Sequence, residues 1–166
     1  FFNLILSKSK ILKTKYIKNM QNEIFGSFYN IILDYSNNPK NFGKLKNNTH
    51  NISANNSICG DKFNIFLIIH DKKIKEAKFF GEGCAISKAS SSILTEIILD
   101  KEFKYINLVF NYFFFITCGY TNRNLNYDTL DEKTIKKISL FSNVKKFPMR
   151  IKCATLTWNS LFFLFK

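Results

Sequence analysis

The clearest pattern of hydrophobic and polar positions is typical of β-strands and begins after Asp61. The stretch KFNIFLIIH is apolar and rich in β-branched and aromatic residues, and IKEAKFF has the same character after a polar turn at residues 71–73. Two such stretches joined by a short turn predict an antiparallel hairpin. The pattern also predicts a preceding strand at residues 51–55.

Elsewhere, apolar residues recur with the spacing of amphipathic helices. A first stripe (Ile24, Phe28, Ile31, Ile32, Tyr35) ends at SNNPKNFG, where proline and glycine stop a helix. After Gly83 three more helices are predicted, with the stripes Ile86, Ala89, Ser90, Ile93, Leu94, Ile97, Ile98; Ile106, Val109, Phe110, Phe113; and Ala154, Trp158, Leu161, Phe162, Phe165. Helical spacing explains the aromatic stripes, so we interpret them as core rather than as cofactor contacts.

Strands come early in the chain and helices come late. This order predicts an α+β fold in which a small antiparallel β-sheet packs against helices. The chain has 166 residues, enough to bury one hydrophobic core. We therefore expect a single domain over residues 21–166.

Residues 1–20 differ from the rest because they contain five lysines and no acidic residue. Such a basic leader is typical of an organellar targeting segment, and an artefact that precedes a true start at Met20 is the alternative. We accordingly expect a cytoplasmic protein, or a plastid or mitochondrial one if the leader targets it. No stretch reaches the ~20 apolar residues that span a bilayer, so no membrane partner is expected.

The net charge is +13, from 25 basic and 12 acidic residues. A field of this sign attracts acidic partners, nucleic acid or anionic membranes. The lysines are scattered, however, among many asparagines, isoleucines and phenylalanines, which indicates a composition bias. Without a dense basic block or regular basic–aromatic interleaving, the sequence predicts no specific nucleic-acid partner.

Four cysteines carry the candidate chemistry: Cys59, Cys84, Cys118 and Cys153. None forms a CxxC pair, and a chain with this much apolar material does not need disulfides. Free or metal-bound thiols are therefore expected. We interpret Cys118, which ends an aromatic run, as a core thiol.

The local context of the other three cysteines favours a metal site. Cys59 precedes a strand in ICGDKF, and an extended backbone would turn its side chain to the same side as that of Asp61. Cys84, in GEGCAIS, falls at a helix N-terminus, where free amide groups favour a thiolate. Cys153, in RIKCATLTW, is also expected to open a helix.

Three thiolates and one carboxylate would form the tetrahedral shell that zinc prefers. The flanking Arg150 and Lys152 could offset the excess negative charge of such a site, or they are simply solvated basic residues beside a buried cysteine. The same shell also accepts iron.

The motifs NNPKNFG, CGD, FFGEGCAISKASSSILTE and KFPMRIKCATLTW occur in the order seen in a known family. Over residues 23–162 the chain resembles the U-type (IscU/NifU N-terminal) iron–sulfur cluster assembly proteins, and most of all the SufU branch. The resemblance implies the SufU/IscU-like fold. The stretch over residues 101–146 matches the family poorly.

The resemblance also implies roles for individual residues. Cys59, Asp61, Cys84 and Cys153 would be the ligands of a zinc ion. Cys59 would accept persulfide sulfur from a SufS-type cysteine desulfurase and pass it to a cluster-assembly scaffold, and Arg150 would contact the partner.

Three functions remain open at this point. The first is a zinc-dependent sulfur carrier, favoured because Lys152 stands where the IscU branch has a histidine, and because the segment before the last cysteine is long. The second is an IscU/NifU-like scaffold that assembles a transient [2Fe–2S] cluster. The third is a basic binding module with a structural metal.

Overall fold

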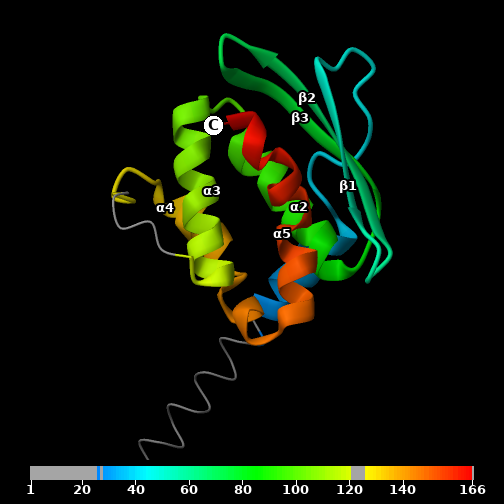
Figure 1. Cartoon of the computed structure of the whole chain (residues 1–166), viewed down its shortest axis with the longest axis vertical. Coiled ribbons are helices and arrows are strands. Elements are labelled where there is room, and N and C mark those ends of the chain that lie inside the picture. The colour runs from blue at the N-terminus through cyan, green and yellow to red at the C-terminus, as the bar shows by residue number, and fades with distance from the viewer. Residues whose placement is uncertain (1–25, 27, 121–125, 166) are drawn as a thin grey trace, which may run out of the picture. The chain divides into compact units, whose positions relative to one another are not determined.

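The computed structural model describes residues 26, 28–120 and 126–165 (Figure 1). The strands are β1 (His50–Asn56), β2 (Asp61–His70) and β3 (Lys73–Glu82). The later helices are α2 (Ala85–Ile98), α3 (Phe103–Cys118), α4 (Glu132–Ser139) and α5 (Pro148–Phe162), with short 3₁₀ helices η1 (Ser142–Lys146) and η2 (Phe163–Phe165) on either side of α5. Residues 28–37 are also helical. The predicted leader at residues 1–20 lies outside the described residues.

The strands form one antiparallel sheet in the order β1-β2-β3. Ile65 in the central strand is fully buried and pairs with Ile52 of β1 and with Phe79 of β3. Asp71 and Lys72, both with φ near +50° (49° and 57°), make the tight turn between β2 and β3. The predicted hairpin and the predicted first strand are both confirmed.

Helices cover one face of this sheet (Figure 1). α2 packs against β3, α5 packs against β1, and the two helices contact each other. α3 lies against α5 on the side away from the sheet, and α4 contacts α3. The predicted α+β fold, a small antiparallel sheet packed against helices, is confirmed.

Aromatic side chains fill the space between α3 and α5. The Trp158 and Phe113 rings stack with their centroids 3.7 Å apart, and the Phe110 ring lies 5.0 Å from Trp158. All three side chains are buried, so the interpretation of the aromatic stripes as core is confirmed for them. The stretch over residues 101–146 therefore contributes to the hydrophobic core through α3.

The predicted position of Cys153 at a helix start is wrong. α5 begins at Pro148, a residue favoured in the first turn because its missing N–H is not needed there. The first turn carries exposed residues, including Met149 and Arg150, so it has no apolar stripe to reveal it. Cys153 consequently lies in the second turn of the helix.

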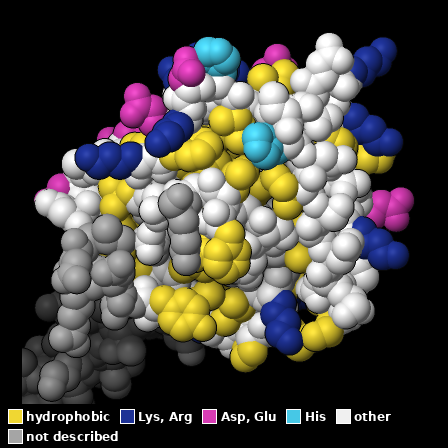
Figure 2. Space-filling view, turned by 45° about the horizontal axis from the view of Figure 1, so that its top comes forward, with side chains coloured by type: hydrophobic (Ala, Val, Ile, Leu, Met, Phe, Trp, Pro, Cys, Tyr) yellow, Lys and Arg dark blue, Asp and Glu magenta, His cyan; other side chains and the backbone are white. Residues whose placement is uncertain are grey.

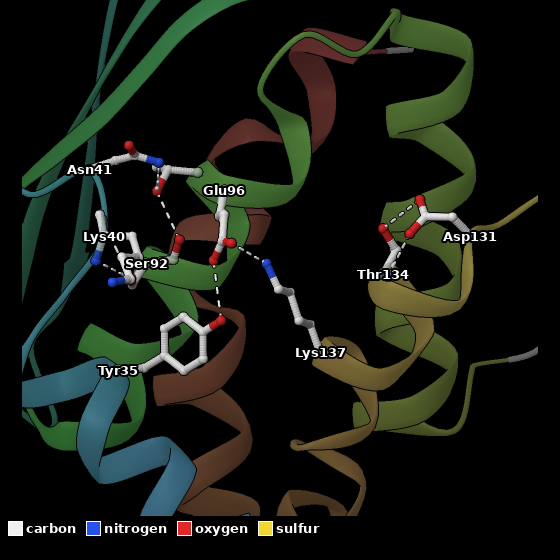
Figure 3. A network of polar contacts seen from close by, with 9 residues as sticks. Tyr35, Lys40, Asn41, Ser92, Glu96, Asp131, Thr134 and Lys137 are labelled. Carbon is white, nitrogen blue, oxygen red and sulfur yellow. Dashed lines mark hydrogen bonds and ion pairs between the residues drawn. The ribbon is translucent and has the colours of Figure 1, made fainter.

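α4 was not predicted from the sequence. It has only eight residues, of which Thr134 and Ile138 are buried, too few for a stripe. Its N-cap is Asp131, whose carboxylate accepts the Thr134 N–H at 2.8 Å. Figure 3 shows Asp131 and Thr134 at this end of the helix.

The predicted loop before the sheet is fixed in two places. The Lys40 N–H donates to the Ser92 hydroxyl of α2 at 2.7 Å, and the Gly43 N–H donates to the Phe79 carbonyl of β3 at 2.8 Å. Nearby, the Glu96 carboxylate accepts the Tyr35 hydroxyl at 3.2 Å and pairs with Lys137 of α4 (Figure 3). Through these contacts α2 is held to the segment over residues 35–40 on one side and to α4 on the other.

The basic side chains are scattered over the surface, as the spacing of the lysines in the sequence indicated. Figure 2 shows the Lys and Arg side chains spread around one face rather than gathered in a block. Among the described residues, no helix combines the length and the apolar character needed to cross a bilayer.

Candidate metal centre

Cys59 lies on the turn that joins β1 to β2, and its side chain is exposed. The turn is closed by the Gly60 N–H, which donates to the Asn56 carbonyl at 2.9 Å. Gly60 has a φ of +74°, a conformation that glycine adopts without strain. The predicted extended backbone from Cys59 to Asp61 is therefore wrong, because this left-handed turn residue separates them.

Asp61 is the first residue of β2 and is completely buried. One of its carboxylate oxygens, Oδ1, accepts the Cys84 N–H at 2.8 Å. The other, Oδ2, is buried and has no hydrogen-bond partner among the described residues. A buried carboxylate oxygen without a partner is costly unless a proton or a cation balances it, so this atom fits a metal ligand.

Cys153 enters the same space from α5 and is also buried. Its Sγ lies 3.3 Å from the Sγ of Cys59. The ligand atoms of Cys59, Asp61 and Cys153 all lie within 4.8 Å of one another. The structure thus brings together three of the four residues named from the sequence in one compact group.

Cys84, the fourth residue, is the N-cap of α2, as predicted. Its Sγ accepts the Ser87 N–H at 3.4 Å, and the Ser87 hydroxyl lies 3.5 Å from the same sulfur. Cys84 is outside the compact group, but its electrostatic interaction with Cys153 raises the pKa of the Cys153 thiol. Ser87 was not predicted from the sequence as part of the site, because a serine within a helix has no motif of its own that marks such a contact.

The electrostatics of the group favour a cation. Burial holds the pKa of the Cys153 thiol well above its ordinary value, and the hydrogen bond with Cys59 and the charges of Cys84 and Asp61 raise it further. Without a cation, Cys153 therefore stays protonated at neutral pH. A bound divalent ion reverses this preference, because a thiol that coordinates a metal is deprotonated.

Two glycines set the distance between β2 and the start of α2. A Cβ at Gly83 would lie 2.7 Å from the Phe63 ring and 2.6 Å from the Ser87 hydroxyl. A Cβ at Gly81, where φ is +149°, would lie 2.0 Å from the Lys62 carbonyl oxygen. The close approach that brings Cys84 to Asp61 is therefore possible only with glycine at these positions.

The exposed residues that flank Cys59 and Cys153 in the chain are both apolar and basic. Ile58, Phe147 and Met149 are at least half exposed, at 57%, 53% and 50%. Arg150, predicted to contact a partner, is exposed in the first turn of α5, and Lys152 is exposed beside Cys153. The role of Arg150 stays a prediction.

Cys118 is the last residue of α3 and is half-buried. Its Sγ lies 3.5 Å from the Thr117 hydroxyl. The interpretation of Cys118 as a core thiol is wrong in degree, because the helix ends there and leaves the side chain partly open to solvent. It is not part of the Cys59, Asp61 and Cys153 group.

The profile of the "NifU-like N terminal domain" family matches residues 28–154. The chain belongs to this family. The matched range includes all four candidate ligands. It also includes residues 101–146, the stretch that resembles the family poorly in sequence.

Relatives from two branches of the NifU-like N-terminal domain family resemble the chain equally. It is 35% identical over 130 residues to the iron–sulfur cluster assembly scaffold protein IscU of Thermotoga maritima, covering 78% of this chain and 86% of that protein. It is 36% identical over 131 residues to the zinc-dependent sulfurtransferase SufU of Bacillus subtilis, covering 79% and 84%. Overall identity therefore does not separate the branches.

A solved structure shows the same fold. FiSufU of Fervidobacterium islandicum AW-1, described as a cluster assembly scaffold protein for the SUF system, has a TM-score of 0.71 and 32% identity to this chain. The similarity covers 82% of this chain and 94% of FiSufU. The predicted resemblance to the SufU/IscU-like fold is confirmed.

Proposed function

We propose that this protein acts in iron–sulfur cluster assembly as a zinc-dependent sulfur carrier, with Cys59 as the residue that accepts sulfur. The observation that carries the proposal is the position of Cys59: its thiol is exposed, yet its Sγ lies 3.3 Å from the buried Cys153 thiol and beside the buried Asp61 carboxylate. Cys59 is thus a thiol that a partner can reach, and it lies next to two buried side chains, Asp61 and Cys153, that can bind a metal.

Cys59, Asp61, Cys84 and Cys153 would hold the zinc ion. The fit rests on the Asp61 oxygen without a partner and on the cluster of thiols around Cys153. When bound, zinc supplies charge that keeps the thiols deprotonated at neutral pH. Iron would suit the same donors.

The sulfur donor in this proposal is a SufS-type cysteine desulfurase that carries a persulfide on its active-site cysteine. The Cys59 thiolate attacks the outer sulfur of that persulfide. A bond forms between Cys59 Sγ and the transferred sulfur, and the donor's sulfur–sulfur bond breaks to leave a thiolate on the donor. One sulfur–sulfur bond replaces another, so no external oxidant or reductant is needed.

The partner would approach over the exposed surface around Cys59. Arg150 is exposed one turn before Cys153, where a guanidinium can bind a carboxylate of the partner with two hydrogen bonds. The apolar side chains of Ile58, Phe147 and Met149 supply contact area beside it. The carrier would then pass its sulfur to a cluster-assembly scaffold.

The second candidate function is a scaffold on which a [2Fe–2S] cluster is built. It is favoured by the relative from Thermotoga maritima, which is named as a scaffold, and by a donor set that suits iron as well as zinc. The residue before Cys153 distinguishes the branches: Lys152 cannot serve as a ligand in the way that the histidine expected in the IscU branch could. We therefore place the scaffold second.

The test measures alanine production by a SufS-type desulfurase with and without the zinc-loaded protein. We expect strong stimulation, which is lost in Cys59→Ser because the attacking thiol is gone. Cys118→Ser is the matched control, since it removes a half-buried thiol outside the group, and it should stimulate like the wild type. Stimulation that survives in Cys59→Ser contradicts the acceptor role. No stimulation by the wild type, with iron and sulfide retained on it, indicates the scaffold.

A further inference from the structure

A polar groove of about 310 Å³ lies between β1 and α5, next to the candidate metal centre. Its lining includes Leu156 and six polar residues: Asn55, Asn56, Lys152, Thr155, Asn159 and Ser160. Asn56 precedes the turn that carries Cys59, and Lys152 precedes Cys153. The groove is therefore adjacent to the metal centre without sharing any of its four candidate ligands.

Asn56 supplies the first observation that points to a ligand. Its side chain is 9% exposed, and its Nδ2 has no hydrogen-bond partner in the described part of the chain. The orientation of the amide is fixed, because Oδ1 accepts the Ile58 N–H at 3.2 Å. The NH₂ group is thus a buried donor on a residue that lines the groove, and such a group is costly to leave unpaired.

Most other polar groups of the groove already have partners. The Thr155 hydroxyl donates to the Ile151 carbonyl at 2.8 Å, and the Ser160 hydroxyl donates to the Leu156 carbonyl at 3.1 Å. The Asn159 amide donates to the Thr155 oxygen at 3.2 Å. The donors left over are the ammonium of Lys152, the buried amide of Asn56 and the exposed amide of Asn55, of which only the Asn56 amide is shielded from water.

Charge determines what the Lys152 and Asn56 donors would hold. Lys152 is exposed and forms no ion pair with the described acidic residues, and none of the residues lining the groove is acidic. One ammonium and one primary amide match the two oxygens of a carboxylate better than the four oxygens of a phosphate, for which arginines and clustered backbone amides are usual.

We propose that the groove between β1 and α5 binds a carboxylate, whose oxygens accept hydrogen bonds from the Asn56 amide and the Lys152 ammonium. The bound group lies beside the turn of Cys59, because Asn56 also holds that turn through the Ile58 N–H and the Gly60 N–H. The proposal does not depend on the zinc or sulfur chemistry above. The carboxylate belongs either to a small free acid or to an acidic side chain of a partner.

The test is a titration of the whole ¹⁵N-labelled chain with sodium acetate, followed by NMR. We expect saturable shifts of the Asn56 side-chain amide and of the backbone amides of Lys152 and Asn159. Sodium chloride at equal ionic strength should produce none of them. Shifts that are equal in chloride, or an absence of saturable shifts because water alone fills the groove, would overturn the proposal, as would tighter binding of sodium phosphate than of acetate.

Variants assign the binding to the two donors. Asn56→Asp removes the NH₂ group but keeps an oxygen for the Ile58 N–H, and Lys152→Gln removes the charge. Each should weaken acetate binding about tenfold or more, since hydrogen bonds to charged groups are among the strong ones. Asn51→Asp, at an exposed position of β1 outside the groove, is the matched control and should bind acetate like the wild type. Unchanged acetate binding in Asn56→Asp contradicts the proposal.

A second arm identifies the source of the carboxylate. If Asn56→Asp weakens acetate binding and also raises the dissociation constant for the desulfurase, the carboxylate is a side chain of that partner. If only acetate binding weakens, the ligand is a small free acid. Because acetate binding is measured without the desulfurase, failure of the sulfur-carrier function leaves this test intact.

Discussion

The Asp61 carboxylate has two oxygens, one of which receives the Cys84 N–H while the other is buried without a partner among the described residues. The same residue therefore stabilises the position of Cys84 and destabilises the metal-free protein. This combination is characteristic of a metal ligand, whose charge is balanced only in the loaded state.

Replacing Asp61 with asparagine should separate these two effects. The amide oxygen still accepts the Cys84 N–H, and a neutral NH₂ group replaces the buried charged oxygen. Because an unpaired buried amide costs less than an unpaired buried charge, we expect the metal-free protein to become more stable by about 1 kcal/mol. Zinc affinity should fall at least about tenfold, because a charged ligand is lost. Chemical denaturation of metal-free protein and competition with a zinc chelator measure the two effects. A metal-free variant less stable than the wild type would contradict the assigned role of Asp61.

Gly83→Ala should displace Cys84. The added Cβ would lie within 2.7 Å of both the Phe63 ring and the Ser87 hydroxyl, so these side chains or the start of α2 must shift. We expect a loss of about 1–3 kcal/mol in the free energy of unfolding, together with weaker zinc binding. Gly26→Ala is the control, since nothing lies within 4 Å of its added Cβ. Equal stability of the two variants would show that the close approach is unimportant.

Among the helices and strands, those with strong periodicity were predictable. The hairpin and the cores of α2, α3 and α5 follow directly from repeated apolar positions. α4 could not be predicted, because an eight-residue helix with two buried residues has almost no hydrophobic periodicity. The first turn of α5 could not be predicted either, because its residues face solvent and add no apolar position to the helical stripe.

The candidate site shows the same division. The four ligand types were predictable from their local motifs and from the family resemblance. Their geometry was not, because Cys59 meets Cys153 through a left-handed glycine turn and the packing of a helix distant in sequence. Periodicity along one segment carries no information about such contacts.

The Asp131 cap of α4 provides a prediction about pH. The hydrogen bond from the Tyr105 hydroxyl, followed by those from Thr134, lowers the pKa of Asp131 from 3.8 to about 2. A lowered pKa in the folded state means that the stabilisation is present above pH 3.8 and is lost as the pH falls through about 2. Asp131→Ala should therefore cost about 1 kcal/mol at neutral pH, as cap removal usually does.

Urea unfolding of wild type and Asp131→Ala at several pH values measures this difference. The two curves should converge as the pH falls through about 2, because the wild-type carboxylate becomes protonated there. Glu132→Ala, which removes an exposed pair with Lys136 from the same turn, is the control and should leave the stability nearly unchanged at every pH. A difference that persists unchanged at low pH would show that the carboxylate charge is not responsible.

For the whole molecule, zinc binding should raise the melting temperature Tm. A ligand present at about 1,000 times its dissociation constant adds about 4 kcal/mol to the folded state, which corresponds to a rise in Tm on the order of 10 °C for a chain of this size. We expect a strong chelator to remove this increment from the wild type and from Cys118→Ser. In Cys59→Ser, which lacks one of the proposed ligands, the decrease should be clearly smaller. An equal decrease in all three proteins would place the stabilising metal elsewhere.

The contact between Cys59 and Cys153 spans 94 residues of sequence, and this separation determines when the site can form. Contacts between distant residues require the intervening chain to fold first, and they are made late and slowly. A nascent chain that has left the ribosome only as far as α4 contains the hairpin turn with Cys59 and Asp61, but not the helix that brings the partner thiol. During synthesis Cys59 is therefore an isolated surface thiol, open to oxidants, until the last helix docks.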